Sequence, residues 1–403
     1  MTVPFFAPDV FAGDRDVLIE TVRRVAMDPA QRFILGDHCA RFEEALRADL
    51  GAVDVVLCGS GTSAITLVLT AMGIGPGDEV VVPAFGCAPL ASTVVNLGAV
   101  PVFADVDPWT MVVDPDEVES LVTARTRAIM PAHMFSVMAD MPRLRGTAAR
   151  HGLHLLEDSA VAQGGRLAGR PAGRWGDAGV FSFVQVKTFG TAGEGGAVVT
   201  DDPDLGRAVR MLRNHGQDGK TRFLHHRIGH NSRFDEVLAA FQLLRMPGLP
   251  GRLERRAQIA DYYTARFTPL VEHGVQPPPP GREGRCFYVY ALLSDRRDAL
   301  RQYLSARGVD SHVYYPQPLP HQPAFAPYAA AGRRWPHAES ACARSLAIPV
   351  HPHLSDAQVE GIADAVCAFA ATAKPTAEPS TEPTAKPSIE PTAEPFTDRK
   401  QRT

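Results

Sequence analysis

Short apolar runs alternate with amphipathic stretches from residue 53 to residue 200. Each run has five or six residues, is mostly aliphatic, and is bounded by Gly, Pro or Asp, which is typical of buried strands. The stretches SAITLVLTAMGI and PDEVESLVTARTRA have helical spacing instead. This alternation predicts an α/β fold with a mostly parallel, seven-stranded sheet covered by helices, since seven runs in succession argue against buried helix segments. The runs occupy residues 53–58, 79–83, 100–104, 128–132, 153–157, 179–183 and 196–200.

A second region, from about Met246 to Thr372, has a different pattern. Helical spacing in LERRAQIADYYTARFTPLVE is followed by the strand-like run CFYVYALL and by two more helical stretches, DRRDALRQYLSARG and SDAQVEGIADAVCAFAA. We expect a large domain over residues 1–245 and a smaller α+β domain over residues 246–372, packed on the first.

Residues 373–403 form a tail of a third kind. Proline recurs at every fourth position from Pro375 to Pro395, and almost nothing apolar is left to bury. Proline at this spacing removes backbone donors and prevents a helix, so we expect a disordered, solvated tail. We interpret it as a solubilising segment, with docking of a partner as the alternative.

The composition is that of an ordinary globular protein: 45% of the 403 residues are hydrophobic and 21% are charged. The net charge of -4 gives no reason to expect nucleic acid or an anionic membrane as a partner. The six cysteines form no CxxC pair and no His/Cys/Asp cluster has metal-ligand spacing, so we expect neither disulfides nor a metal. The N-terminal sequence lacks a signal-peptide pattern and no run approaches about 18 apolar residues, which predicts a soluble, cytoplasmic protein.

Lysine is rare in this chain. Of the 41 lysines and arginines only five are lysines, and three of these lie in the tail, which leaves Lys187 and Lys220. Lys187 lies in GVFSFVQVKTFGTAGEGG, after an apolar strand and before a glycine-rich turn. Desolvation in such a place favours the neutral amine, which is a nucleophile toward aldehydes. A surface lysine at a strand end is the alternative.

Two further motifs supply complementary groups. LHLLEDSA places Asp158 at the carboxyl end of a predicted strand, the edge where open α/β sheets bind ligands, although capping of a following helix is the commoner role. In CGSGTSAITLVL, the backbone amides of Gly61, Thr62 and Ser63 begin a helix and are candidates for a phosphate cradle. Such turns before helices are common, so this motif is weak by itself.

Together these groups match one cofactor, pyridoxal 5'-phosphate (PLP). PLP needs an amine for its aldehyde, an acid that keeps its pyridine nitrogen protonated, and donors for its phosphate. Lys187, Asp158 and the turn at residues 61–63 meet these needs in that order. Ser182 adds a hydroxyl close to the lysine in sequence.

The chain resembles the DegT/DnrJ/StrS family of PLP-dependent sugar aminotransferases from about Arg32 to Val366. The block GDAGVFSFVQVKTFGTAGEGGAVVT is specific to that family. Weaker matches follow the order of the family, namely FILGDHCARFEEAL, GSGTSAITLVL, GIGPGDEVVVPAF, GAVPVFADVDP, HGLHLLEDSA, GHNSRFDEVLAAF, VYYPQPLPHQPAF and LAIPVHPHL. The resemblance implies a type I PLP-transferase fold and a homodimer with both active sites at the subunit interface.

The resemblance also implies roles for single residues. It assigns Lys187 to the bond with the cofactor, Asp158 to the pyridine nitrogen, and Thr62 and Ser182 to the phosphate. Asn231, in GHNSRF, matches the asparagine that the neighbouring subunit contributes to the phosphate.

Two positions depart from the family pattern. Val161 stands where members usually carry a Gln or His near the phenolic oxygen of the cofactor, and Gln163 is a candidate for that polar role. Cys87 stands where an aromatic ring usually stacks on the cofactor, and Phe85 is a candidate for the ring. These substitutions leave the cofactor assignment in place but weaken the transfer of a standard substrate.

Three histidines fall at family positions near the substrate. His133 lies in the PAH segment, and His225 with His226 lies where sugar-nucleotide enzymes carry a basic or aromatic loop. We interpret each as a core or surface histidine rather than a substrate contact.

We therefore expect a PLP-dependent aminotransferase that moves an amino group from L-glutamate or L-glutamine to a keto sugar, with Lys187 as general acid–base. The resemblance makes a nucleotide-linked keto-hexose the leading acceptor, in amino-sugar or antibiotic biosynthesis. An inosose-type cyclitol ketone is second, because Gln185 and the GEGG turn resemble the cyclitol branch. A sugar dehydratase is disfavoured, since relatives of that kind replace the lysine with histidine, and a non-enzymatic regulator has no need of the complete set of groups.

Overall fold

All seven predicted strands form, and they make one sheet in the order β1-β9-β8-β5-β4-β2-β3. The computed structural model describes residues 2–9, 11–30 and 32–372. Neighbouring strands are parallel from β3 to β8, whereas β9 pairs antiparallel with both β8 and β1. The prediction of an α/β fold with a mostly parallel sheet is confirmed. The strands are β1 (Asp54–Cys58), β2 (Glu79–Pro83), β3 (Val100–Ala104), β4 (Thr126–Ile129), β5 (His154–Asp158), β8 (Ala178–Ser182) and β9 (Gly196–Thr200).

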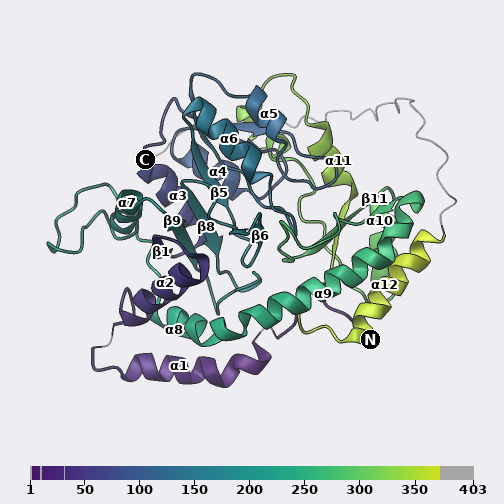
Figure 1. Cartoon of the computed structure of the whole chain (residues 1–403), viewed down its shortest axis with the longest axis horizontal. Coiled ribbons are helices and arrows are strands. Elements are labelled where there is room, and N and C mark those ends of the chain that lie inside the picture. Colours follow the sequence, from purple (N-terminus) through teal and green to yellow (C-terminus); the bar gives the residue numbers. More distant parts are fainter. Residues whose placement is uncertain (1, 10, 31, 373–403) are drawn as a thin grey trace, which may run out of the picture.

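Helices bury both faces of this sheet (Figure 1). In β1, Val56 and Cys58 pack in one core cluster with helix α3, whereas Val55 and Leu57 pack in another with α2 and α8. Because successive side chains of a strand point to opposite faces, burial on both sides makes the strand a continuous apolar run. The helices of this part are α1 (Arg15–Met27), α2 (Asp37–Leu50), α3 (Gly61–Ala71), α4 (Pro89–Asn96), α5 (Pro115–Ser120), α6 (Met141–His151), α7 (Pro203–Arg213) and α8 (Glu236–Arg245).

A smaller antiparallel sheet, in the order β10-β11-β12, lies in the C-terminal part. The long helix α9 leads to it from α8 and packs against α12 (Figure 1). The division into domains at residue 245 stays a prediction, and the proline-rich tail lies outside the described residues. The elements are α9 (Leu249–Phe267), β10 (Val275–Gln276), β11 (Tyr290–Ser294), α10 (Arg297–Ser305), α11 (Pro336–Arg344), β12 (Ser345–Ile348) and α12 (Asp356–Ala370).

Short elements connect these parts. A two-stranded ribbon, β6 with β7, lies between β5 and β8 in the chain. Its strands and the 3-10 helices are β6 (Arg166–Leu167), β7 (Arg170–Pro171), η1 (Ala12–Asp14), η2 (Met246–Gly248), η3 (Thr268–His273), η4 (Leu319–His321) and η5 (Ala326–Tyr328).

Two predicted elements differ from the structure. The stretch PDEVESLVTARTRA is helical only to Ser120, and its last residues begin β4, where Ala128 and Ile129 are buried. Pairing of β4 with β2 and β5 overrides the helical spacing of the sequence there. The run CFYVYALL forms a strand only from Tyr290, because only its second half pairs with β12.

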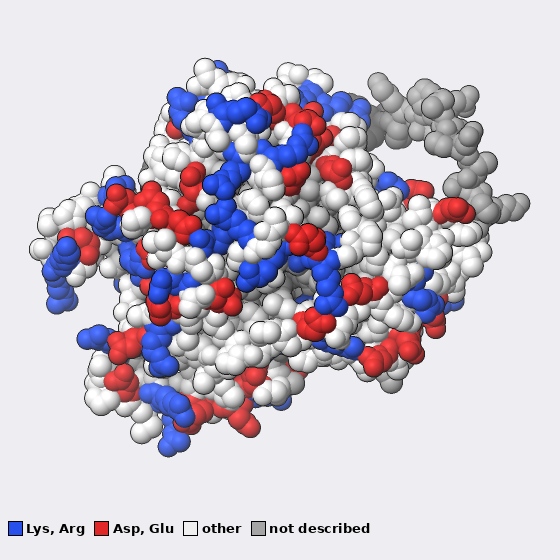
Figure 2. Space-filling view, in the orientation of Figure 1, with Lys and Arg blue, Asp and Glu red and all other residues white. Residues whose placement is uncertain are grey.

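The surface carries both signs of charge. Figure 2 shows Lys and Arg side chains interspersed with Asp and Glu across the visible face. An arm that follows α7, residues 214–232, projects from the body beside that helix (Figure 1). No helix of the described residues has the length and apolarity that crossing a membrane requires.

Candidate active site

The carboxyl ends of neighbouring strands bring the predicted groups to one sheet edge. Asp158 is the last residue of β5 and Ser182 the last of β8, and these strands are paired. Lys187 follows in a tight loop, in which its N–H donates to Val184 O at 2.9 Å. A Cβ on Gly190 would lie 2.3 Å from Gln185 O, so the loop that holds Lys187 requires glycine there.

The Lys187 side chain is half-buried and its Nζ lies 4.6 Å from the centroid of the Tyr288 ring. Within the described residues it has no carboxylate at ion-pair distance. Burial raises the pKa of both Asp158 and Cys87, and the charge of Lys187 opposes that rise. The amine therefore lies among Tyr288, Asp158 and Cys87 in a confined place. A snorkelling surface lysine does not fit this position.

Asp158 is only 4% exposed. Burial raises the pKa of its carboxyl, and the N–H of Ala160, which donates to Oδ1 at 3.0 Å, and the charge of Lys187 oppose that shift. The next element after β5 is the strand β6, so Asp158 does not begin a helix and the alternative role as a helix cap is wrong. A buried carboxylate whose second oxygen has no hydrogen bond among the described residues needs a cationic partner, and a protonated pyridine nitrogen is one.

The turn before α3 forms a cradle against β8. A Cβ on Gly61 would lie 2.9 Å from Ser182 Cβ, so glycine permits the close approach of the two segments. The N–H of Ser63 donates to Ser60 Oγ at 3.1 Å in the helix cap and is not free for a ligand. The amides of Gly61 and Thr62 have no partner among the described residues, which leaves two of the three predicted amides for a phosphate.

Asn231 lies beside the same turn. Thr62, Ser63 and Asn231 line one pocket of about 670 Å³, and Ser232 Oγ accepts from the Gly59 N–H at 3.1 Å. The chain alone thus brings Asn231 near the phosphate cradle. Its contribution to a neighbouring subunit stays a prediction.

The position of the missing aromatic ring is occupied by a thiol. Burial raises the pKa of Cys87 to about 12, so this residue is a neutral thiol beside Asp158 and Lys187. Phe85 is fully buried and packs edge-on against Tyr315, with ring centroids 5.3 Å apart, which disfavours a role in stacking on the cofactor.

Tyr315 and Tyr288 are site residues that our reasoning from the sequence missed. Burial raises the pKa of Tyr315 well above its usual value, and the neighbouring Cys87, Tyr288 and Asp158 groups act in the same direction. Tyr315 is therefore close to these groups. The motif VYYPQPLPHQPAF carries it, but nothing in the spacing of that motif tells which tyrosine reaches the site.

Gln163 remains a candidate for the polar role that Val161 lacks. It is 5% exposed, and neither its Oε1 nor its Nε2 has a hydrogen bond among the described residues. Because buried amides are nearly always hydrogen-bonded, these two atoms are available to a bound ligand.

His133 has a structural role, as interpreted from the sequence. Its Nε2 lies 2.7 Å from Glu157 Oε1, and its Nδ1 accepts from the Ala139 N–H at 3.1 Å. Glu157 also accepts from the Gly173 and Trp175 amides at 2.6 and 2.8 Å. This fully buried pair fixes the backbone next to Asp158.

The other two histidines lie on the projecting arm. The ring of His225 is hydrogen-bonded to His215 O at 2.7 Å, and His226 lies 3.2 Å from Asp218. Both are exposed and have local partners, as surface histidines do.

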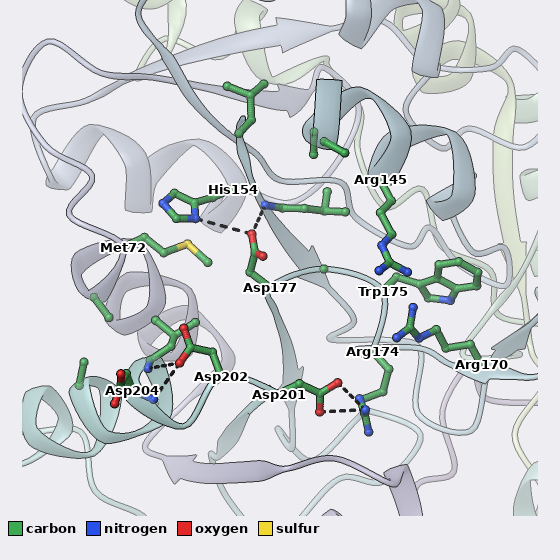
Figure 3. A pocket seen from close by; sticks show the side chains of 18 of the residues that line it. Met72, Arg145, His154, Arg170, Arg174, Trp175, Asp177, Asp201, Asp202 and Asp204 are labelled. Atoms are coloured by element: carbon green, nitrogen blue, oxygen red, sulfur yellow. Dashed lines mark hydrogen bonds and ion pairs between the residues drawn. The ribbon is translucent and has the colours of Figure 1, made fainter. Parts of the chain in front are cut away.

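A separate pocket of about 740 Å³ lies at the opposite edge of the sheet, where β5 begins and β9 ends. Figure 3 shows its charged lining, including the ion pairs Arg174–Asp201 and His154–Asp177. None of the predicted site residues lines it. The edge that carries Asp158 and Ser182 is therefore the candidate active site.

The fold, the lysine, the buried acid and the amide cradle define a PLP-dependent aminotransferase. Comparison with known families agrees: a model described as the DegT/DnrJ/EryC1/StrS aminotransferase family matches residues 16–367. The chain belongs to this family.

Three relatives cover between 62% and 90% of this chain. A dTDP-3-amino-3,4,6-trideoxy-alpha-D-glucose transaminase of Streptomyces venezuelae is 37% identical over 90% of this chain and 95% of its own. A "pleiotropic regulatory protein" of Geobacillus stearothermophilus is 37% identical over 84% of this chain and 91% of its own. An L-glutamine:scyllo-inosose aminotransferase of Streptomyces griseus is 38% identical over 62% of this chain and 61% of its own.

Solved structures agree with the fold and the cofactor. S. venezuelae DesV, in complex with a ketimine intermediate, has a TM-score of 0.87 and 36% identity over 92% of this chain and 98% of its own. NtdA of Bacillus subtilis, with the bound cofactor pyridoxamine phosphate (PMP), has a TM-score of 0.85. Its identity is 28% over 92% of this chain and 85% of its own. The type I PLP-transferase fold and PLP as cofactor are thus confirmed.

Proposed function

We propose that this enzyme transfers an amino group from L-glutamate or L-glutamine to a keto sugar, with a nucleotide-linked keto-hexose as the leading acceptor. The observation that carries this proposal is the convergence of Lys187, Asp158 and the turn of Gly61 and Thr62 at one sheet edge. The dTDP-sugar transaminase that matches over 90% of this chain supports the choice of acceptor.

Each residue has a role that follows from its place. When bound, PLP accepts the electron pair left when a proton leaves the donor's α-carbon. Lys187 would hold the cofactor at its aldehyde carbon, and its amine would move the proton of the donor's α-carbon as general acid–base. Asp158 holds a positive charge at the pyridine nitrogen. Phosphate oxygens would accept hydrogen bonds from the Gly61 and Thr62 amides, and Ser182 and Asn231 would be further donors.

A cyclitol ketone is the second candidate acceptor. The matching L-glutamine:scyllo-inosose aminotransferase supports it, although it covers less of the chain than the dTDP-sugar transaminase does. We further propose that the enzyme works as a cytoplasmic homodimer with shared active sites, in amino-sugar or antibiotic biosynthesis.

The test separates the two halves of the reaction. PLP-loaded enzyme is mixed with L-glutamate or L-glutamine, and the keto acid released is measured by mass spectrometry. The aminated enzyme is then offered dTDP- and UDP-linked keto-hexoses and scyllo-inosose. We expect stoichiometric keto acid and amination of a nucleotide-linked sugar. Amination of scyllo-inosose alone would favour the second candidate, and no keto acid from either donor would contradict the proposal.

A further inference from the structure

A small pocket lies beside Lys187, apart from the phosphate cradle. It has a volume of about 280 Å³ and lies between the N-terminal segment, the start of α9 and the loop that follows β12. Lys187 and Thr188 form part of its wall, whereas Gly61, Thr62 and Ser182 do not. This size suits a small ligand or one end of a larger one.

The pocket has an excess of positive charge. Its one carboxylate belongs to Asp14, and its cations are Lys187, Arg245, Arg252 and Arg256. Asp14 is paired with Arg245 Nε at 2.7 Å. Arg252 and Arg256 have no carboxylate partner among the described residues, and their hydrogen bonds go to backbone carbonyls. Because buried positive charge without a counter-charge is costly, the pocket favours an anion.

Five buried polar atoms of the lining residues have no hydrogen-bond partner in the described part of the chain. They are Nε of Arg252, Nε of Arg256, Oγ1 of Thr188 and both ring nitrogens of His351. Thr188, Arg256 and His351 are each 7% exposed. Since buried polar groups are nearly always paired, five such atoms around one pocket indicate a ligand that brings oxygen acceptors. A guanidinium offers Nε and Nη in one plane, which matches the two oxygens of a carboxylate.

The protonation states agree with this ligand. Burial lowers the pKa of Arg256 to about 10, so its guanidinium stays charged at neutral pH. Burial, assisted by the charge of Arg256, lowers the pKa of His351 to about 4. A neutral His351 has one N–H donor for a carboxylate and adds no further positive charge.

We infer that this pocket holds a carboxylate of the amino donor, with Arg252 and Arg256 as its counter-charges and His351 as a hydrogen-bond donor. The inference rests on the proposed function, because the amino donor carries a carboxylate on its reacting carbon, whereas the keto-hexose ring carries none there and the phosphates of a nucleotide-linked acceptor lie at its nucleotide end. Arg252, Arg256 and His351 are positioning residues. They orient the amino donor at Lys187 and let the enzyme distinguish the donor from the acceptor.

The experiment uses the PLP-loaded enzyme and glutarate, a dicarboxylate without an amino group. Glutarate binding is measured by calorimetry, and its competition with L-glutamate is measured from the donor's effect on the visible absorption of the cofactor. The variants are Arg252→Gln and the charge-preserving Arg256→Lys. Arg255→Gln is the matched control, since Arg255 is on the same helix but is paired with Asp356 at 2.7 Å and does not line the pocket.

We expect glutarate to compete with L-glutamate, and both variants to weaken binding of both ligands about tenfold or more with the cofactor absorption unchanged. The control should bind both like the parent. Wild-type affinities in both variants, or glutarate binding that does not compete with L-glutamate, would overturn the inference. If no donor reacts at all, the proposed function fails, and the glutarate affinities of the variants still decide whether the pocket binds a carboxylate.

Discussion

Asp158 combines a functional requirement with a cost in stability. Its carboxyl is buried and accepts one hydrogen bond, from Ala160, and burial raises its pKa in the absence of the cofactor. A raised pKa means that the fold disfavours the ionised form, so this residue contributes stability below its ordinary pKa and loses it as pH rises through the raised value. In the proposed role of Asp158, the positively charged ring nitrogen of the bound cofactor would offset that loss.

We therefore predict opposite effects of Asp158→Asn on stability and activity. The cofactor-free variant should be more stable than the parent at pH 7 by roughly 1–3 kcal/mol, and the difference should vanish as pH falls toward 4. Turnover of the loaded variant should fall roughly 100-fold or more, because the ring nitrogen loses its counter-charge. Thermal unfolding against pH and steady-state kinetics measure the two effects. A cofactor-free variant that is less stable at pH 7 would contradict this account.

The residue types in the sequence predicted the chemistry of the site. They did not predict which side chains from separate loops lie next to one another there. Lys187, Asp158 and Gly61 stand in motifs whose roles follow from local sequence. By contrast, Cys87 and Tyr315 meet only because separate loops fold onto one sheet edge. That contact depends on tertiary packing, and no local spacing encodes it.

Helix α2 begins on a carboxylate that comes from another helix. Glu236, in α8, is 2% exposed and accepts from the backbone amides of Gly36, His38 and Cys39, each at 2.8 Å. A Cβ on Gly36 would lie 2.9 Å from this carboxyl group. A negative charge that satisfies the free N–H groups of a helix start stabilises the helix and ties α2 to α8.

We predict that Glu236→Gln lowers the free energy of unfolding by about 2 kcal/mol at pH 7, because a neutral amide replaces the charged acceptor. Burial pushes the pKa of Glu236 up, but the hydrogen bonds from Cys39 and His38 outweigh it and lower the pKa overall. A lowered pKa contributes stability above pH 4.5 that is lost as pH falls, so the difference between variant and parent should shrink in acid.

Denaturant unfolding at pH 7 and pH 4 measures this effect. Glu254→Gln is the control, since Glu254 is an exposed residue of α9 whose ion pair with Arg282 is screened by solvent and should contribute little to stability. Equal effects of the two substitutions at pH 7 would contradict the proposed cap.

At the scale of elements, strand positions were more predictable than strand directions or helix ends. All seven apolar runs became strands because burial on both faces demands such composition. The antiparallel direction of β9 depends on its pairing with β8, the strand before it, and with β1, which lies far away in the chain. The end of α5 at Ser120 depends on the pairing of β4 in the same way.

The projecting arm bears on the assembly of the whole molecule. Its apolar residues Phe223 and Ile228 are 71% and 96% exposed, as is typical of surfaces that a second protein covers. The arm returns to the body at Asn231, beside the phosphate cradle. The homodimer in which Asn231 serves the neighbouring subunit stays a prediction, because Asn231 also lies beside the cradle of its own chain.

Mixed dimers test whether the site is shared. Lys187→Ala and Asn231→Ala chains are co-expressed with different tags and the mixed species is assayed. If Asn231 acts across the interface, one of the two sites in each mixed dimer is intact, and about half of the parent activity should return although each variant alone is impaired. Activity no higher than the mean of the two separate variants would place Lys187 and Asn231 of one site in the same chain.

The central claim is that Lys187 carries the cofactor in this enzyme. The most direct measurement is borohydride reduction of the PLP-loaded protein, which makes the carbon–nitrogen bond between lysine and cofactor permanent, followed by peptide mass spectrometry. The account predicts a single labelled peptide that contains Lys187, with Lys220 unlabelled, and no label when L-glutamate is added before reduction. A label on Lys220 or elsewhere, or no label on the loaded protein, would contradict it.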